Sequence, residues 1–233
     1  MLKRLIDIIG AFAGLLVLSP LLCVILFFVW KQDGHSPFYI SDRVGRDGTP
    51  FRMLKIRSMV ILADLASVES TSATDARITP IGHFVRRWKL DELSQLWNVL
   101  IGDMSLVGPR PNTVREVASY TTAERRLLTV KPGITDISSI VFSDEGEILR
   151  DALDPDRAYS ELIRPWKSRL GLVYIENASW LLDIQLIWIT ILAIFNKPLS
   201  LKRITQILGR QEADAVLIQI VRREQPLRPS PLP

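Results

Sequence analysis

Two adjacent carboxylates are the residues of this chain whose types and spacing could do chemistry. Asp91 and Glu92 come shortly after a basic cluster that contains Arg86, and a Gly-Pro-Arg-Pro turn with Arg110 follows them. Arginines near carboxylates would neutralise them unless an anion such as a phosphate also occupies the site. Carboxylate oxygens also suit a hard cation. The pattern therefore predicts a site that handles a phosphate with the help of a metal ion.

A helix is expected to position the pair. Apolar residues recur at helical spacing from residue 90 to residue 100, and Gly102 is well placed as the C-terminal cap. Asp91 and Glu92 would open this helix, where free backbone N–H groups favour an anion. Acidic residues in a first turn also complement the helix dipole, so a purely structural role is the alternative. The basic residues around the pair favour chemistry, although each could belong to a solvated face: Lys55, Arg57, Arg77, Arg86, Arg87 and Arg110.

The composition indicates a protein with membrane-embedded parts. Hydrophobic residues make up 48% of the 233 residues and the mean hydropathy is +0.19, which is high for a soluble domain. The net charge of +4 suits an anionic lipid surface or a phosphorylated substrate. Nucleic acid is not an expected partner, because no recognised binding motif accompanies the charge. A single cysteine, Cys23, excludes an internal disulfide, and the distant His35 and His83 argue against a zinc site.

The N-terminal apolar segment, residues 5–30, contains one charge, Asp7, and is flanked by Lys3, Arg4 and Lys31. It is too long for a cleavable signal and lacks a small-residue cleavage site. A helix of this length would measure about 39 Å and could cross the roughly 30 Å core of a bilayer. The segment is therefore expected to enter a membrane.

Ser19-Pro20 interrupts this segment near its middle. Proline removes a backbone donor and bends a helix, and Ser19 could hydrogen-bond to a freed carbonyl. Each half is then too short to span a bilayer alone. Positive charge at both ends favours placing both ends on the cytoplasmic side. A re-entrant hairpin in one leaflet and a kinked spanning helix are both compatible with the residues.

Further elements are expected along the rest of the chain. Residues 38–40 and 50–59 are strand candidates, and residues 63–76 indicate a loop or a weak helix. Residues 180–195 form a short apolar helix with aromatic residues, either interfacial or buried in the core. Residues 202–221 predict a surface helix with a basic face, and the prolines that follow predict a disordered end.

The motifs together resemble those of the bacterial sugar transferases, the monotopic phosphoglycosyl transferases of the small single-domain form. The resemblance runs from about Lys3 to Phe195. Its pieces, in order, are Ser19-Pro20, Arg43-Val44-Gly45-Arg46, Pro50-Phe51-Arg52, Lys55-Ile56-Arg57-Ser58-Met59, Arg77-Ile78-Thr79-Pro80-Ile81-Gly82, Leu90 to Val99, Gly102 to Pro111, and Lys131-Pro132-Gly133-Ile134-Thr135. The complete set of motifs in this order makes the resemblance specific. Any one of these motifs alone would not be specific.

The resemblance implies an activity and a role for each site residue. Family members move a sugar 1-phosphate from a UDP-sugar to polyprenyl (undecaprenyl) phosphate and release UMP, which starts the assembly of capsule, O-antigen, exopolysaccharide or glycoprotein glycans. Asp91 is the implied nucleophile, through an aspartyl-phosphosugar intermediate, and an implied ligand of Mg²⁺. Glu92 would position or deprotonate the acceptor. The implied phosphate-binding residues are Arg86 and Arg110, with Lys55 and Arg57 as further candidates.

The resemblance also implies a fold class and a location. We expect a mostly helical α+β fold in a monotopic protein on the cytoplasmic face of the bacterial inner membrane. Residues 1–32 would form the re-entrant helix, residues 33–196 the catalytic domain with interfacial helices, and residues 197–233 an amphipathic and proline-rich tail. Membrane lipids are expected partners, and downstream glycosyltransferases and a second copy of the chain are further candidates.

Three departures from the family pattern limit what carries over. Residues 136–142 replace the Gly and the Gln-Val-Asn-Gly run that many members have after Pro-Gly-Ile-Thr, and Gly171 stands where many members carry an acid. The multi-span N-terminal extension of the longer hexose-phosphate transferases is also missing, which favours a minimal form, several of which use N-acetylated amino sugars. The identity of the sugar stays open. The alternative function is a membrane-anchored, non-catalytic partner of a glycan assembly complex.

Overall fold

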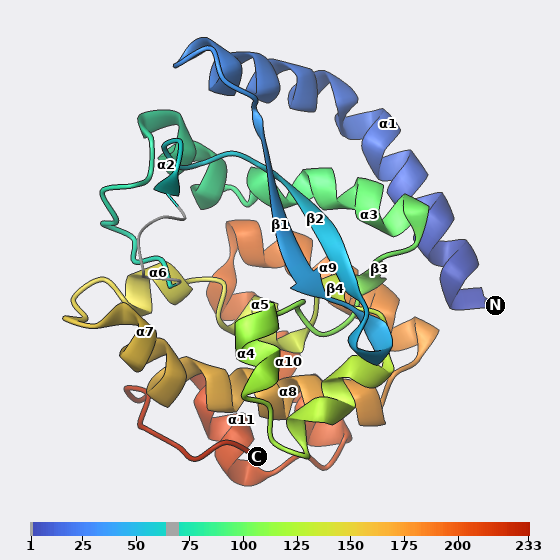
Figure 1. The fold of residues 1–233 in the computed structure, drawn as a ribbon. Helices are drawn as coiled ribbons and strands as arrows, with labels where there is room; N and C mark the ends of the chain where they lie inside the picture. The colour runs from blue at the N-terminus through green and yellow to red at the C-terminus, as the bar shows by residue number, and fades with distance from the viewer. Residues whose placement is uncertain (1, 64–69) are drawn as a thin grey trace.

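The computed structural model describes residues 2–63 and 70–233 and confirms a mostly helical α+β fold (Figure 1). The long helix α1 (Leu2–Lys31) precedes a hairpin of strands β1 (Phe38–Val44) and β2 (Pro50–Ile56). The elements that carry the sequence motifs follow: α2 (Pro80–Arg87), the 3₁₀ helix η3 (Leu90–Gln95), α3 (Leu96–Ile101), β3 (Ser105–Val107), α4 (Val114–Ala118), η4 (Glu124–Thr129) and β4 (Gly133–Thr135). The rest is helical: α5 (Ile137–Val141), α6 (Glu145–Ile148), α7 (Pro155–Ala158), the π-helical turn η5 (Tyr159–Ile163), α8 (Arg164–Glu176), α9 (Trp180–Phe195), α10 (Lys197–Arg210) and α11 (Ala215–Arg222).

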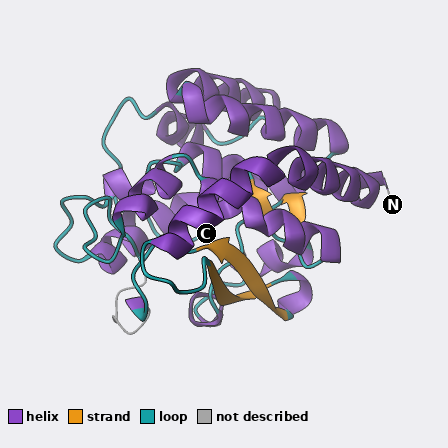
Figure 2. Ribbon diagram, turned by 90° about the horizontal axis from the view of Figure 1, so that it is seen from above, coloured by secondary structure: helices purple, strands orange, loops and turns teal. Residues whose placement is uncertain are grey.

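Two small sheets lie among the helices (Figure 2). The β1–β2 pair is antiparallel and confirms the two expected strands, and the predicted loop at residues 63–76 lies partly outside the described residues. The β3–β4 pair is parallel, with Ser105 opposite Gly133. A Cβ on Gly133 would lie 2.0 Å from the backbone nitrogen of Gly108. Only glycine therefore allows the Pro-Gly-Ile-Thr motif to lie against the Gly-Pro-Arg-Pro motif.

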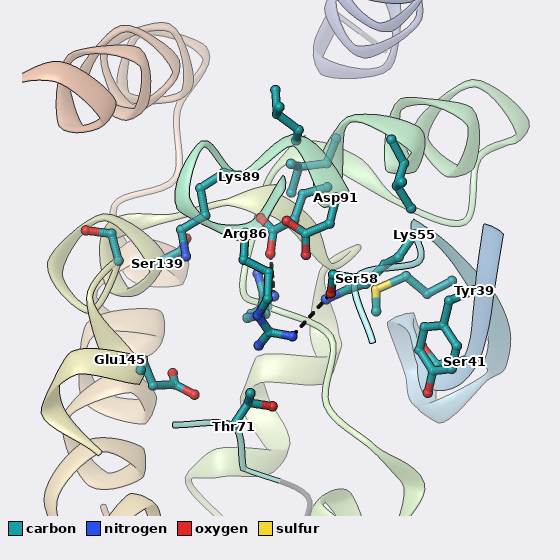
Figure 3. Close-up of a pocket in the computed structure, with 18 of the residues that line it drawn as sticks. Tyr39, Ser41, Lys55, Ser58, Thr71, Arg86, Lys89, Asp91, Ser139 and Glu145 are labelled. Atoms are coloured by element: carbon teal, nitrogen blue, oxygen red, sulfur yellow. Dashed lines mark hydrogen bonds and ion pairs between the residues drawn. The ribbon is translucent and has the colours of Figure 1, made fainter. Parts of the chain in front are cut away.

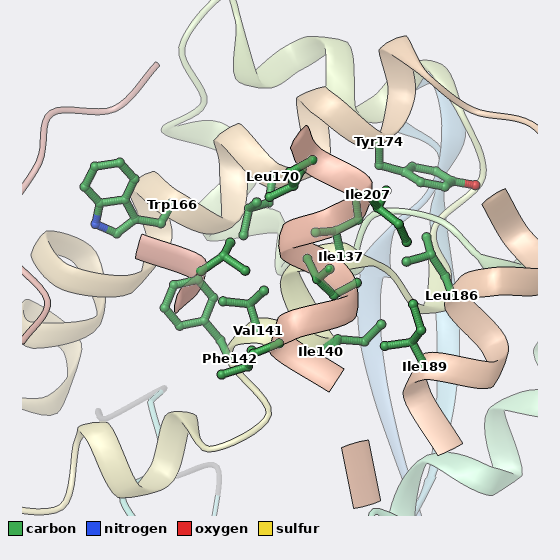
Figure 4. Close-up of a cluster of buried hydrophobic side chains, with 14 of the residues drawn as sticks. Ile137, Ile140, Val141, Phe142, Trp166, Leu170, Tyr174, Leu186, Ile189 and Ile207 are labelled. Atoms are coloured by element: carbon green, nitrogen blue, oxygen red, sulfur yellow. The ribbon is translucent and has the colours of Figure 1, made fainter. Parts of the chain in front are cut away.

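The main hydrophobic core is built by α5, α8, α9, α10 and α11 (Figure 4). Ile137 and Ile140 of α5 pack with Leu170 of α8 and Leu186 of α9, and all four side chains are buried. Helix α9 buries one face and exposes the other, because Trp188 and Phe195 are largely exposed. The core alternative for residues 180–195 therefore holds for one face of the helix, and the interfacial alternative stays a prediction for the exposed apolar face.

Helix α1 lies along the domain and exposes a wide apolar face. Ala11 and Val29 are fully buried against the domain, whereas Phe12 and Val17 on the outer face are 61% and 74% exposed. Ser19 Oγ donates a hydrogen bond of 2.8 Å to the carbonyl of Leu16. That carbonyl is the one that the missing N–H of Pro20 leaves free, so the expected back-bond is confirmed. The helix is long and apolar enough to enter a membrane.

The prediction of a disordered C-terminal end is wrong. Arg169 donates hydrogen bonds to the Ser230 hydroxyl and to the Pro231 carbonyl, both at 3.0 Å, and Thr121 donates one of 2.7 Å to the Pro233 carbonyl. Composition predicts disorder when too little surface can be buried. Here specific hydrogen bonds to the domain hold the segment in place.

Candidate active site

Asp91 and Glu92 lie in η3, immediately after a sharp turn of the chain. Lys89, which precedes this short helix, has left-handed backbone angles (φ 55°, ψ 26°). The expected helix therefore begins as a 3₁₀ helix and becomes α-helical only at Leu96, and its predicted C-terminal cap, Gly102, is confirmed by its φ of 99°. This turn places Asp91 at a cavity (Figure 3), and Glu92 also lines that cavity.

The two carboxylates differ in their hydrogen bonds. Glu92 Oε1 accepts a bond of 2.5 Å from Arg110 Nη2, so the two motifs of the sequence meet in an ion pair. Asp91 is 8% exposed, and its Oδ1 atom is buried and accepts no hydrogen bond from any described residue. A buried, unpaired carboxylate oxygen costs stability. Asp91 is therefore the group in this cluster that is left available for a ligand.

The pKa values of Asp91 and Glu92 are shifted in opposite directions. Burial raises the pKa of Asp91, and the positive charge of Lys55 opposes that rise. Burial also acts on Glu92, but the charges of Arg110 and Lys55 outweigh it and hold the pKa of Glu92 well below its ordinary value. Groups with strongly perturbed pKa values in a cleft mark candidate functional sites.

Lys55 is brought to the carboxylates by a clamp on strand β2. The Asn98 side-chain oxygen accepts a hydrogen bond of 2.9 Å from the N–H of Leu54, and the Ser94 hydroxyl donates one of 3.2 Å to the Leu54 carbonyl. Ser94 lies in η3 with Asp91, and Asn98 lies in α3 directly after it, so the two residues fix β2 beside Asp91. Burial and the charge of Arg110 lower the pKa of Lys55 to about 8.

The other predicted phosphate-binding residues divide into two groups. Arg86 and Arg110 join Lys55 around the carboxylates, and Arg86 also reaches Ser58 Oγ at 3.4 Å. Arg57 lies outside this cluster: it is 5% exposed and donates two hydrogen bonds to Asp33, at 2.6 and 2.7 Å. Its other donors reach the carbonyls of Ser36 and Val29. Arg57 therefore fixes the C-terminal end of α1.

Sequence reasoning missed charged residues around the cavity. Lys89 contributes positive charge at both Asp91 and Glu92, but its left-handed backbone has no clear signal in the sequence. Glu145 forms an ion pair with Lys167 on another side of the cavity (Figure 3). Lys89 lies only two residues before Asp91, whereas Glu145 and Lys167 lie far from the motif in sequence. Their charge and their place next to helix starts were the only signals available.

The cavity is large and has both polar and apolar walls. It measures about 2640 Å³, beyond the roughly 300–1,000 Å³ of a pocket for one small ligand. Tyr39 and Ser41 of β1 line one side, and residues of α1 and α9 also face it (Figure 3). The cavity therefore offers polar side chains to a ligand on one side and the apolar surfaces of α1 and α9 on another.

The chain's own residues could hold only part of a Mg²⁺ coordination shell. Among residues 2–63 and 70–233, no group of three or more His, Cys, Asp or Glu side chains is arranged to bind a metal. Mg²⁺ commonly takes one or two carboxylates and completes its shell with substrate phosphates and water. The unpaired oxygen of Asp91 suits that arrangement.

Two departures from the family pattern have structural explanations. A Cβ on Gly171 would lie 2.8 Å from Leu127 Cδ2, so this position is packed and does not line the cavity. Asp136 caps α5 in a reciprocal arrangement with Ser139. Residues 136–142 therefore form an ordered helix beside the cavity, and neither departure disrupts the carboxylate cluster.

Comparison with known proteins agrees with this architecture. The family model "Bacterial sugar transferase" matches residues 1–197. The chain therefore belongs to the bacterial sugar transferase family. Helices α10 and α11 lie almost entirely beyond the matched region, yet they contribute Leu201 and Leu217 to the main core.

Several curated bacterial proteins are similar to this chain. The UDP-galactose-lipid carrier transferase of Erwinia amylovora is 41% identical over 58% of this chain and 31% of its own length. The UDP-glucose:undecaprenyl-phosphate glucose-1-phosphate transferase of Escherichia coli K12 is 34% identical over 82% of this chain and 39% of its own length. The exopolysaccharide production protein ExoY of Sinorhizobium fredii is 32% identical over 82% of this chain and 84% of its own length. The chain thus spans about a third of the first two relatives and most of the third.

Proposed function

We propose that the protein is a phosphoglycosyl transferase that moves a sugar 1-phosphate from a UDP-sugar to polyprenyl phosphate. The observation that carries the proposal is the buried, unpartnered carboxylate oxygen of Asp91 amid the charges of Lys55, Arg86 and Arg110. Such a group can attack phosphorus while the cations stabilise charge on the phosphoryl oxygens. The names of the relatives support both substrate classes.

In the first step, a carboxylate oxygen of Asp91 bonds to the phosphorus that carries the sugar. The bond from this phosphorus to the bridging oxygen of the diphosphate breaks, and UMP leaves. Lys55 opposes the effect of burial on the pKa of Asp91 and so favours the ionised form that this attack needs. The product is an acyl phosphate on Asp91.

In the second step, a phosphate oxygen of the polyprenyl phosphate attacks the same phosphorus and the bond to Asp91 breaks. The acceptor needs no strong base, because the second pKa of a phosphate monoester is about 6. Glu92 is a weak base, since its pKa is held low and Arg110 occupies its Oε1 atom. We therefore assign Glu92 to the positioning of Arg110 beside the reacting phosphates.

Mg²⁺, held in part by Asp91, would neutralise diphosphate charge when it is bound. Lys55, Arg86 and Arg110 supply fixed positive charge whether or not the donor is present. Their positions around the carboxylates orient the diphosphate and stabilise charge on its oxygens.

The proposal includes a re-entrant, one-leaflet placement of α1. At its start, Lys3 Nζ bonds to Asp183 at 2.6 Å, and Asp7 accepts a bond of 2.9 Å from the N–H of Leu106. At its end, Asp33 pairs with the buried Arg57. Both ends of the helix are therefore held by one domain, which supports placing them on one side of the membrane. Lys3, Arg4 and Lys31 favour the cytoplasmic face of the inner membrane.

The proposal extends to the pathway step and the partners. Transfer of the first sugar to a lipid carrier starts the assembly of a polysaccharide or glycan, as the name of the Sinorhizobium relative suggests. Membrane lipids would cover the exposed apolar faces of α1 and α9. Downstream glycosyltransferases and a second copy of the chain remain proposed partners.

The test is a reaction with purified protein, Mg²⁺, undecaprenyl phosphate and a panel of UDP-sugars. We expect UMP release with at least one donor, and release that depends on the acceptor over many turnovers. A protein that binds these ligands and releases no UMP from any donor would instead act as a non-catalytic partner in glycan assembly. The panel also identifies the sugar.

A further inference from the structure

An apolar groove leads away from the carboxylate cluster between helices α1 and α9. On α1, Ile6, Gly10, Gly14, Leu18 and Leu21 line the cavity that contains Asp91. They recur at intervals of three and four residues, so they form one stripe along the helix, about 22 Å long at 1.5 Å per residue. The stripe is apolar throughout.

Helix α9 supplies the opposite wall. Ile187, Ile191 and Ile194 line the same cavity, and Ile191 and Ile194 are 46% and 40% exposed. Their spacing also places them on one side of the helix. Leu106 of β3 and Ile134 of β4 line the cavity between the two helices.

The polar groups of this groove are satisfied within the protein. The hydroxyls of Thr135 and Thr190 lie 2.6 Å apart, and Thr190 also donates a hydrogen bond of 2.7 Å to the carbonyl of Leu186. An apolar surface with paired polar groups favours a hydrocarbon occupant over water. The Lys3–Asp183 ion pair joins the starts of the two helices, and Phe195 at the end of α9 contacts Trp88, which lies three residues before Asp91.

We infer that this groove binds the isoprenoid chain of the acceptor. One continuous cavity presents cations at Lys55, Arg86 and Arg110 and hydrocarbon walls on α1 and α9. A molecule with one phosphate and a long apolar chain matches both parts at once. The inference rests on the proposed function and adds where the chain lies: along the inner stripe of α1, while membrane lipids cover its outer face.

The inference predicts that the groove selects acceptors by chain length. The variants Ile191→Trp and Leu18→Trp would fill it from either wall. Matched controls are Ile184→Trp and Leu16→Trp, because both residues are exposed on the same helices and neither lines the cavity. All four variants introduce the same indole side chain at a fully or partly exposed apolar position of α1 or α9.

The experiment measures KM for undecaprenyl phosphate and for the short acceptor geranyl phosphate, in the same mixed micelles. For the groove variants we expect KM for the long acceptor to rise roughly tenfold, with little change for the short one and none in the controls. Equal changes for both acceptors, no change for either, or the same change in the controls would overturn the inference. Any of these results would mean that the groove does not hold the isoprenoid chain.

A donor-only arm separates this inference from the proposed function. Formation of the phosphosugar adduct from UDP-sugar without acceptor should be the same in the groove variants and the parent protein. A parent protein that forms no adduct and releases no UMP would refute the proposed function. A parent protein that reacts normally, with groove variants that keep the parent KM for the long acceptor, would refute the groove alone.

Discussion

Two buried carboxylate clusters in this protein differ in how far their oxygen atoms are satisfied. Glu124 is fully buried, and each of its carboxylate oxygens accepts two hydrogen bonds, from Arg164, Ser168 and the N–H of Thr121. Asp91 is nearly as buried, yet its Oδ1 atom has no partner among the described residues. The first cluster stabilises the fold, whereas the second retains an unpaired acceptor where a cavity opens. Incomplete satisfaction is what separates the proposed site from a structural ion pair.

The largest expected effect comes from Asp91→Asn. Removal of a covalent nucleophile should lower kcat by roughly 10⁴-fold or more. The free energy of unfolding should stay the same or rise, because the variant removes a buried charge whose Oδ1 atom accepts no hydrogen bond from the described residues. UMP release and chemical unfolding measure the two effects, with the exposed turn variant Asp47→Asn as the control. Normal turnover by Asp91→Asn would show that the residue is not the nucleophile.

The opposite outcome is expected for Glu124→Gln. This change leaves the largely buried Arg164 with only the more distant Glu116 as a counter-charge, and loss of one partner of a buried pair costs up to about 3–5 kcal/mol. The unfolding midpoint should fall, while protein that remains folded at low temperature should keep the parent kcat. A large loss of kcat without a loss of stability would remove the distinction between the two clusters.

Much of the difference between the Glu124 and Asp91 clusters could not be predicted from the sequence. The helix at residues 180–195, the β1–β2 hairpin and the Gly102 cap follow from local patterns and are confirmed. Lys55 and Arg57 look equivalent in the sequence, but β2 ends at Ile56, and Arg57 turns to Asp33 instead of the carboxylates. Such long-range pairings depend on tertiary packing, which local residue patterns do not encode.

The pairing of Asp91 with Glu92 shows the same limit at short range. The sequence locates both acids, and the resemblance implies their roles. Burial raises the pKa of Asp91, whereas at Glu92 the charges of Arg110 and Lys55, which come from other parts of the chain, outweigh burial and lower the pKa. The single surface helix expected over residues 202–221 is instead two helices, α10 and α11, whose apolar faces are buried in the main core. No motif predicted this burial, since these helices lie almost entirely beyond the family match.

The pH dependence of kcat/KM tests how much the charge of Lys55 contributes to the Asp91 cluster. Its pKa of about 8 means that it is protonated at neutral pH and loses its positive charge as the pH rises past that value. Since this charge favours both diphosphate binding and ionised Asp91, kcat/KM should fall above pH 8, by about tenfold per pH unit. In Lys55→Arg the guanidinium stays charged, so this decline should move to much higher pH. An identical decline in the variant would exclude Lys55 as its cause.

The smallest expected effect concerns the wall of the cavity that carries Glu145. The preceding residue, Asp144, pairs with Lys197 and, at 3.5 Å, with Arg223 after α11. Loss of one partly exposed partner should therefore loosen this wall only slightly. We expect Arg223→Gln to raise the donor KM by about threefold, the effect of roughly 0.6 kcal/mol, with the neighbouring Arg222→Gln as the control. A donor KM equal to that of the control would show that this ion pair does not support the site.

The most direct test is the mass of the intact protein after incubation with its UDP-sugar and Mg²⁺ in the absence of acceptor. We predict a mass increase equal to one sugar phosphate, located by fragmentation on the peptide that contains Asp91 and removed when polyprenyl phosphate is added. Release of UMP with an unchanged protein mass, or an adduct on a different residue, would contradict the account.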